Sequence, residues 1–221
     1  MKKSWLPTFV LLGIVWGSSF LFIKNGLQFL TPVGVAFIRC ALGAITLILI
    51  SWQRKVKLSR DKKVWGHLLV ISLLLNSIPG VLFAVAETQV TSILAGIINA
   101  VTPLMTVLSI MVLLRSEKPK PVQLVGLLVG FIGVMIVLGV WQGLGSNPLG
   151  YVLCLFAAVT CYGISFAYSR RFVMPYKLKP TAAATMQLIW ATIVLLPGFL
   201  IDGIAKDEYR LVPVVSMLIM G

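Results

Sequence analysis

The chain has 221 residues, of which 59% are hydrophobic and only 11% are charged, and its mean hydropathy is +1.01. Soluble domains are usually about 45–50% apolar and about 25% charged, so this composition excludes an ordinary water-soluble globule, a disordered region and a disulfide-rich secreted module. The net charge of +13 comes from 19 Lys and Arg against 6 Asp and Glu. In a chain this apolar, the excess bears on orientation in a membrane and gives no reason to expect nucleic acid binding.

Seven apolar runs are long enough to cross a bilayer, whose hydrocarbon core needs roughly 20 helical residues. They cover residues 5–23, 33–52, 65–86, 90–114, 121–140, 149–169 and 181–201. An eighth run begins near Leu211 and reaches only Gly221, about half a bilayer at about 1.5 Å per residue. The sequence therefore predicts an all-α polytopic membrane protein with seven full helices and part of an eighth.

The start of the chain allows a second interpretation. Lys2 and Lys3 followed by an apolar stretch fit a signal peptide. The stretch continues through Ile23, and similar segments follow throughout the chain. An uncleaved first helix is therefore the favoured interpretation.

Basic residues are distributed unevenly between the two sets of connecting segments. With the N-terminus inside, the inward-facing segments hold fifteen Lys and Arg, whereas the outward-facing segments hold Lys24, Lys206 and Arg210. Positive residues favour the cytoplasmic side of a membrane, so we expect a cytoplasmic N-terminus and a multi-pass protein of the cell membrane. Segments rich and poor in Lys and Arg alternate regularly along the chain, which also supports the number of spans, because one missed helix would break this alternation.

The first and sixth runs share a motif at an offset of 146 residues. Residues 16–24 read WGSSFLFIK and residues 162–170 read YGISFAYSR, with three identical positions. At an offset of 148, Pro32 falls opposite Pro180 and Arg39 falls opposite Gln187. Equivalent runs are five spans apart and cross the membrane in opposite senses, which is the pattern of an inverted-topology repeat.

This repeat divides the chain into two units. We expect a first five-helix repeat over residues 5–145 and a second repeat over residues 147–221. The second repeat would stop inside the counterpart of the third run. We therefore expect the chain to be C-terminally incomplete relative to a ten-helix protein.

Several short motifs occur in a specific order along the chain. The main ones are Trp16-Gly17-Ser18-Ser19-Phe20, Ala36-Phe37-Ile38-Arg39 and Thr102-Pro103-Leu104, together with Pro32, Ala95, Asn99, Glu117, Gly126, Gly130 and Gly133. In their order and spacing these motifs resemble the EamA-type members of the drug/metabolite transporter superfamily. The resemblance implies a ten-helix carrier of two inverted five-helix repeats with both termini cytoplasmic. Many relatives export amino acids or other small metabolites.

Interrupted helices near the membrane midplane are where transporters usually bind their substrates. Asn76 lies mid-way along the third run, just before Pro79 and Gly80, which indicate a hinge or cavity wall, or alternatively a static kink. In the fourth run Asn99 and Thr102 share a face beside Pro103. They predict either a cavity wall or hydrogen bonds between helices.

Aromatic and hydroxyl residues in the two repeats form a matching set. Trp16 with Ser19, and Tyr162 with Ser165, either flank one cavity from opposite sides or pack between helices. The complete set of candidate substrate-binding residues is Trp16, Ser19, Asn76, Asn99, Thr102, Tyr162, Ser165 and Gln187.

Arg39 is the one basic residue well inside a run, which makes it a functional candidate by default. Three interpretations remain: a structural or gating pair with Glu87, anion binding, or snorkelling toward the outer surface. The candidate hinge or gating residues are Pro79, Gly80, Pro103, Arg39 and Glu87.

Other polar and small residues favour structural roles. The glycines of the fifth run predict close helix packing, and His67 is interpreted as an interfacial residue, with a proton relay as the alternative. Cys40, Cys154 and Cys161 lie in apolar runs and are expected to be buried. One His and six acids give little material for a metal site, so no metal or cofactor is expected.

These features favour a secondary transporter that moves a small amino acid-like or drug-like metabolite, with export as the expected direction. Its partners would be the solute and the lipid bilayer, with no nucleic acid, and the sequence predicts no oligomeric state. An enzyme is not expected, because paired acids at membrane depth and a phosphate-binding GxxxxGK[ST] loop are lacking. The alternative is a seven-helix receptor or another non-transporting membrane protein, which the inside N-terminus disfavours.

Overall fold

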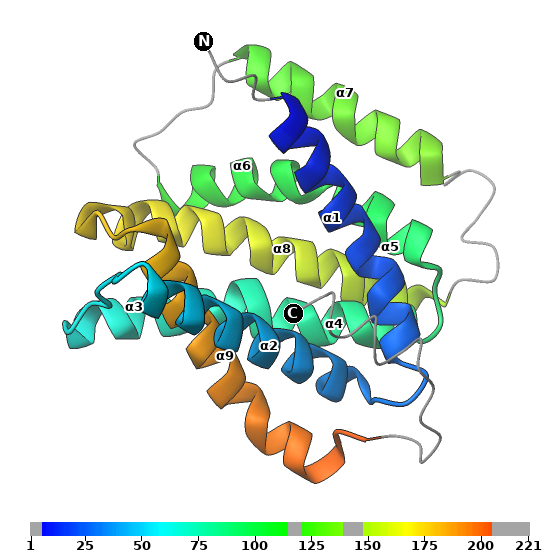
Figure 1. The fold of residues 1–221 in the computed structure, drawn as a ribbon. Coiled ribbons are helices and arrows are strands. Elements are labelled where there is room, and N and C mark those ends of the chain that lie inside the picture. The colour runs from blue at the N-terminus through cyan, green and yellow to red at the C-terminus, as the bar shows by residue number, and fades with distance from the viewer. Residues whose placement is uncertain (1–5, 115–120, 139–147, 205–221) are drawn as a thin grey trace.

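The computed structural model describes residues 6–114, 121–138 and 148–204, and over these residues the regular elements are helices (Figure 1). In chain order they are α1 (Leu6–Gly26), α2 (Pro32–Gln53), α3 (Lys62–Ser72), α4 (Ile78–Glu87), α5 (Ser92–Asn99), α6 (Thr102–Leu113), α7 (Pro121–Leu138), α8 (Leu149–Phe172) and α9 (Pro180–Asp202). A π-helical turn, Leu73–Ser77, joins α3 to α4, and a 3-10 turn, Met174–Tyr176, follows α8. One isolated antiparallel bridge links Leu30 to Ile204.

Six helical segments of the described chain are long and apolar enough to cross a membrane, and α7 contributes a shorter apolar helix. The six are Phe9–Gly26, Pro32–Gln53, Lys62–Glu87, Ser92–Leu113, Leu149–Phe172 and Pro180–Asp202. Together with α7 they coincide with the seven runs expected from the sequence. The all-α polytopic architecture is therefore confirmed, while the eighth run expected from Leu211 lies outside the described residues.

Capping residues begin several of these helices. The Thr31 side chain accepts a hydrogen bond from the backbone N–H of Gly34, and Pro32 occupies the first turn of α2. Asp61 and Thr91 cap α3 and α5 in the same way. A cap satisfies an N–H group that has no partner within the helix, and proline is tolerated in the first turn because its missing N–H would be unpaired there anyway.

Two spans are interrupted, and each interruption lies about one turn before a proline. Proline has no N–H and its ring clashes with the carbonyl four residues earlier, so the regular helix cannot continue through that turn. Before Pro79 this position is Leu75, at the centre of the π-helical turn, and before Pro103 it is Asn99, the last residue of α5. The continuous runs of the sequence thus become α3 with α4, and α5 with α6.

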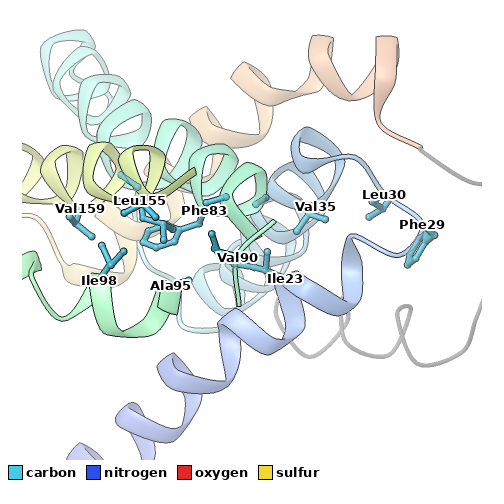
Figure 2. Packing of buried hydrophobic residues seen from close by; sticks show 14 residues of the cluster. Ile23, Phe29, Leu30, Val35, Phe83, Val90, Ala95, Ile98, Leu155 and Val159 are labelled. Atoms are coloured by element: carbon cyan, nitrogen blue, oxygen red, sulfur yellow. The ribbon is translucent and has the colours of Figure 1, made fainter. Parts of the chain in front are cut away.

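The core joins α1, α2, α4, α5 and α8, and the cluster drawn in Figure 2 includes Ile23, Val35, Phe83, Ile98 and Leu155. Its members range from Ile23 to Val159 along the chain. This cluster holds the first four spans against the sixth.

A second contact runs along the full length of α2 and α9, which lie antiparallel. At one end the hydroxyls of Ser51 and Thr185 are 3.0 Å apart. Toward the other end the rings of Phe37 and Phe199 stack with their centroids 4.3 Å apart. Beyond them the Thr31 hydroxyl donates to the carbonyl of Asp202.

The glycine stripe of α7 does not make the close helix contact that the sequence suggested. A Cβ added at Gly126, Gly130 or Gly133 would meet no atom of the described chain within 4 Å, and Gly126 and Gly130 line a hollow of about 400 Å³ between α7 and the first half of α6. The close approach occurs instead at Gly163 of α8, where an added Cβ would lie 2.6 Å from the Met105 carbonyl oxygen of α6. The spacing of glycines in the sequence shows where a helix has a narrow face, but only the position of the neighbouring helix shows at which glycine the two backbones come close.

Candidate functional site

A cavity of about 250 Å³ lies between α2, the π-helical turn, α4 and α8. Its polar lining consists of Arg39, Asn76 and Tyr162. The remaining wall is apolar or small: Ile23, Val35, Ala36, Cys40, Gly43, Leu75, Gly80 and Leu188. We refer to it below as the central cavity.

Each polar group reaches the central cavity from a different helix. Arg39 comes from the second turn of α2, and no hydrogen bond or ion pair to its guanidinium occurs among the described residues. Asn76 is placed by the π-helical turn, and its amide nitrogen is buried without a hydrogen-bond partner. Tyr162 of α8 is held by its ring, which stacks on Phe83 of α4 at a centroid distance of 5.9 Å.

The other candidate residues lie outside the wall of the central cavity. Trp16 is 58% exposed on α1, although the sequence makes it the counterpart of Tyr162. Asn99 and Thr102 hydrogen-bond to each other at 3.3 Å across the break between α5 and α6. Gln187 lies on α9, where its backbone carbonyl accepts a hydrogen bond from the Ser72 hydroxyl.

The two candidate serines make the same local bond. Ser19 donates to the Trp16 carbonyl at 2.6 Å, and Ser165 donates to the Tyr162 carbonyl at 2.8 Å. Both hydroxyls therefore already donate a hydrogen bond within their own helices. Of the eight candidate binding residues, the central cavity brings together Asn76 and Tyr162, and it adds Arg39 and Gly80 from the hinge and gating set.

Glu87 makes contacts other than the expected pair with Arg39. It is fully buried at the end of α4, and its Oε2 accepts a hydrogen bond from the Ser92 hydroxyl at 2.8 Å. Lys24 of α1 donates to the backbone carbonyls of Glu87 and Val90. No ion pair joins Glu87 to Arg39 in the described chain, so the pairing interpretation does not hold in this structure.

His67 belongs to an aromatic cluster that the sequence did not reveal. Its Nδ1 lies 2.8 Å from the Tyr168 hydroxyl, and its ring stacks on Phe172 with the centroids 5.4 Å apart. Tyr168 and Phe172 are four residues apart and therefore lie on one face of α8, and this spacing is the sequence feature that could have predicted the cluster. The cluster ties α3 to α8 at the end of the bundle where α8 finishes.

Within the part of the chain that the structure describes, no group of three or more His, Cys, Asp or Glu residues could hold a metal ion. The chemistry that the central cavity offers is therefore recognition by one guanidinium, one amide and one phenol.

Comparison with known proteins places these features in a family. Residues 3–139, more than half of the chain, match the EamA-like transporter family. The chain is 28% identical over 191 residues to the uncharacterized inner membrane transporter YedA of Escherichia coli (strain K12), an alignment that covers 86% of this chain and 60% of YedA.

Two further relatives come from a Bacillus and an Archaeoglobus species. The uncharacterized transporter YoaV of Bacillus subtilis (strain 168) is 24% identical over 222 residues, covering 96% of this chain and 74% of YoaV. An uncharacterized transporter of Archaeoglobus fulgidus is 23% identical over 220 residues, covering 99% of this chain and 75% of that protein. Because the family match covers more than half of the chain, from α1 through α7, the chain belongs to the EamA-like transporter family.

Proposed function

We propose that this multi-pass membrane protein is a secondary transporter that moves a small organic metabolite, amino acid-like or drug-like, through the central cavity by alternating access. The observation that carries the proposal is a cavity lined by three polar side chains between otherwise apolar spans. Polar groups at membrane depth are costly and usually mark a solute pathway. The family match supports the same conclusion.

The depth of the polar groups supports a transport site. Arg39 is seven residues into α2, about 10 Å from its start at about 1.5 Å per residue. Asn76 lies near the middle of the Lys62–Glu87 span, and Tyr162 near the middle of α8. All three therefore lie well away from both membrane surfaces, where transporters bind solutes at interrupted helices.

The contact between α2 and α9 supports the inverted repeats over residues 5–145 and 147–221. At the offset of 148, the contact between Ser51 and Thr185 maps onto the contact between Phe199 and Phe37. A two-fold axis between α2 and α9 would produce this relation, and rocking about it would expose the cavity to each side in turn.

Orientation and direction belong to the same proposal. The fifteen-to-three distribution of Lys and Arg supports a cytoplasmic N-terminus as part of this proposal. Net export of the metabolite is the expected direction, by analogy with many transporters of the superfamily.

The proposal is tested by counterflow of small metabolites in liposomes that contain the purified full-length protein. Gly80→Val is expected to reduce saturable uptake at least about tenfold, since its side chain would occupy a cavity wall that now carries none. Gly66→Val is the matched control in the same span, where an added Cβ meets nothing within 4 Å. The proposal is wrong if the wild type shows no saturable uptake of any organic solute, or if folded Gly80→Val transports normally.

Ser165→Ala is expected to change uptake by no more than about twofold, because the hydroxyl is committed to the Tyr162 carbonyl within its own helix. Tyr162→Ala, three residues away, is expected to lose most uptake because it removes a wall of the central cavity. Initial rates of counterflow compare the two variants. A larger loss in Ser165→Ala than in Tyr162→Ala would show that the serine, and not the cavity wall, contacts the solute.

A further inference from the structure

Resting on the carrier function above, we propose that the central cavity is a carboxylate site, in which Arg39, Asn76 and Tyr162 hold the carboxylate of a small organic acid or amino acid. The solute class would then be defined by an anionic group at membrane depth, and its uncharged part would lie against the apolar wall.

The charge of the cavity is the first reason. Among the described residues that line it, Arg39 is the one that carries a charge, and a guanidinium stays protonated under all ordinary conditions. No acidic side chain of the described ranges lines the cavity with it, and Glu87 is engaged by Ser92 instead. A cation at this depth without a counter-charge is unfavourable, so an anionic solute would gain binding energy by neutralising it.

The hydrogen-bond inventory is the second reason. The buried Asn76 amide nitrogen has no acceptor, and leaving such a donor unsatisfied is costly. The Arg39 guanidinium carries five N–H donors in a planar fork that matches a carboxylate, and the Tyr162 hydroxyl adds another donor. The site therefore offers mainly donors, which is the complement of a carboxylate, an acceptor-only group.

The size and shape of the cavity are the third reason. Its volume of about 250 Å³ is below the range of roughly 300–1,000 Å³ that holds drug-sized ligands. Gly80 and Ala36 keep the backbones of α4 and α2 close, since a Cβ added at Gly80 would lie 3.5 Å from the Ala36 Cβ. Ile23 and Val35 add apolar surface to the same wall. The space fits a short carboxylic acid or a small amino acid.

Binding by the purified full-length protein tests the proposal directly. The probes are propionate and alanine, their uncharged amides propionamide and alaninamide, and inorganic phosphate, all measured by calorimetric titration in detergent at constant chloride. At least one carboxylate is expected to bind at least about tenfold more tightly than its amide and than phosphate. Equal binding of acid and amide would overturn the carboxylate assignment, and tighter binding of phosphate would reassign the site to phosphate.

Two variants connect the binding to the cavity. Arg39→Gln is expected to weaken carboxylate binding at least about tenfold, whereas Arg60→Gln, which removes the same charge from an exposed loop, should leave it unchanged. Asn76→Asp places a carboxylate of the protein beside Arg39, so it should compete with the solute and lower affinity without unfolding the protein. If Arg39→Gln fails to fold, Asn76→Asp decides the matter, and unchanged affinity in that variant overturns the proposal.

Transport measurements separate this proposal from the carrier function. Saturable uptake of an uncharged solute that survives Arg39→Gln would overturn the carboxylate site and leave the carrier intact. Arg39-dependent carboxylate binding without any uptake would support the site and overturn the carrier function. Carboxylate uptake that Arg39→Gln abolishes and Arg60→Gln preserves is the result expected if both hold.

Discussion

Gly163→Val is expected to prevent the normal packing of α6 against α8 and to lower the yield of folded protein sharply. A Cβ at this position would lie 2.5 Å from the carbonyl carbon and 2.6 Å from the carbonyl oxygen of Met105. Both atoms belong to the backbone, so no change of rotamer can relieve the clash, and the two helices must move apart. Overpacking of this kind costs about 1–3 kcal/mol, and a backbone neighbour puts the cost at the upper end.

The measurement is the fraction of monodisperse protein after detergent extraction, together with its apparent Tm. Gly150→Val is the matched control, because it makes the same substitution in the same helix at a position where an added Cβ meets nothing within 4 Å. The control should behave as the wild type does. A Gly163→Val protein with the Tm and yield of the wild type would contradict the close contact between α6 and α8.

Deletion of Leu74 is expected to abolish transport while leaving the protein folded. A π-helical turn closes its hydrogen bonds one residue later than an α-helical turn, so it holds one extra residue. Removing one residue within Leu73–Ser77 takes out the extra residue of the wide turn and keeps α3 and α4 in their present registers, while Pro79 still leaves a kink without its backbone hydrogen bond. The Trp190 side chain can still donate to the Trp65 carbonyl, and Phe83 can still pack against Tyr162. Asn76 loses the wide turn that places it in the central cavity.

Deletion of Leu69, in the regular part of α3, is the control. It rotates the preceding part of the helix by about 100° because an α-helix has about 3.6 residues per turn. That rotation turns the buried Val64 and Leu68 out of their contacts, so this variant is expected to misfold. Circular dichroism and extraction yield report folding, and counterflow reports transport. Wild-type transport by the Leu74 deletion would assign the π-helical turn a purely structural role.

Most of the fold follows from local properties of the chain. A span is an apolar run of sufficient length, and the seven full runs expected from the sequence are helical within a few residues of their bounds, two of them as a pair of helices. Pro79 and Pro103 also act locally, since each removes a backbone hydrogen bond and obstructs the carbonyl four residues earlier. The sequence indicated a hinge or kink before Pro79 without specifying a π-helical turn, and it did not predict the turn between Asn99 and Thr102 that divides α5 from α6.

Only the tertiary structure decided which polar residues share a cavity. Trp16 with Ser19 and Tyr162 with Ser165 are equivalent in sequence, yet Tyr162 lines the central cavity and Trp16 is largely exposed. Glu87 was the acid expected beside Arg39, but the Ser92 hydroxyl of α5 donates to its carboxylate instead, and Lys24 of α1 donates to its backbone carbonyl. In a helix that is apolar on every side, the periodicity does not specify which face turns inward. That rotation is set by close contacts with other helices, such as Gly163 against Met105 and Phe37 against Phe199, and these contacts bring Arg39, Asn76 and Tyr162 together from three separate helices.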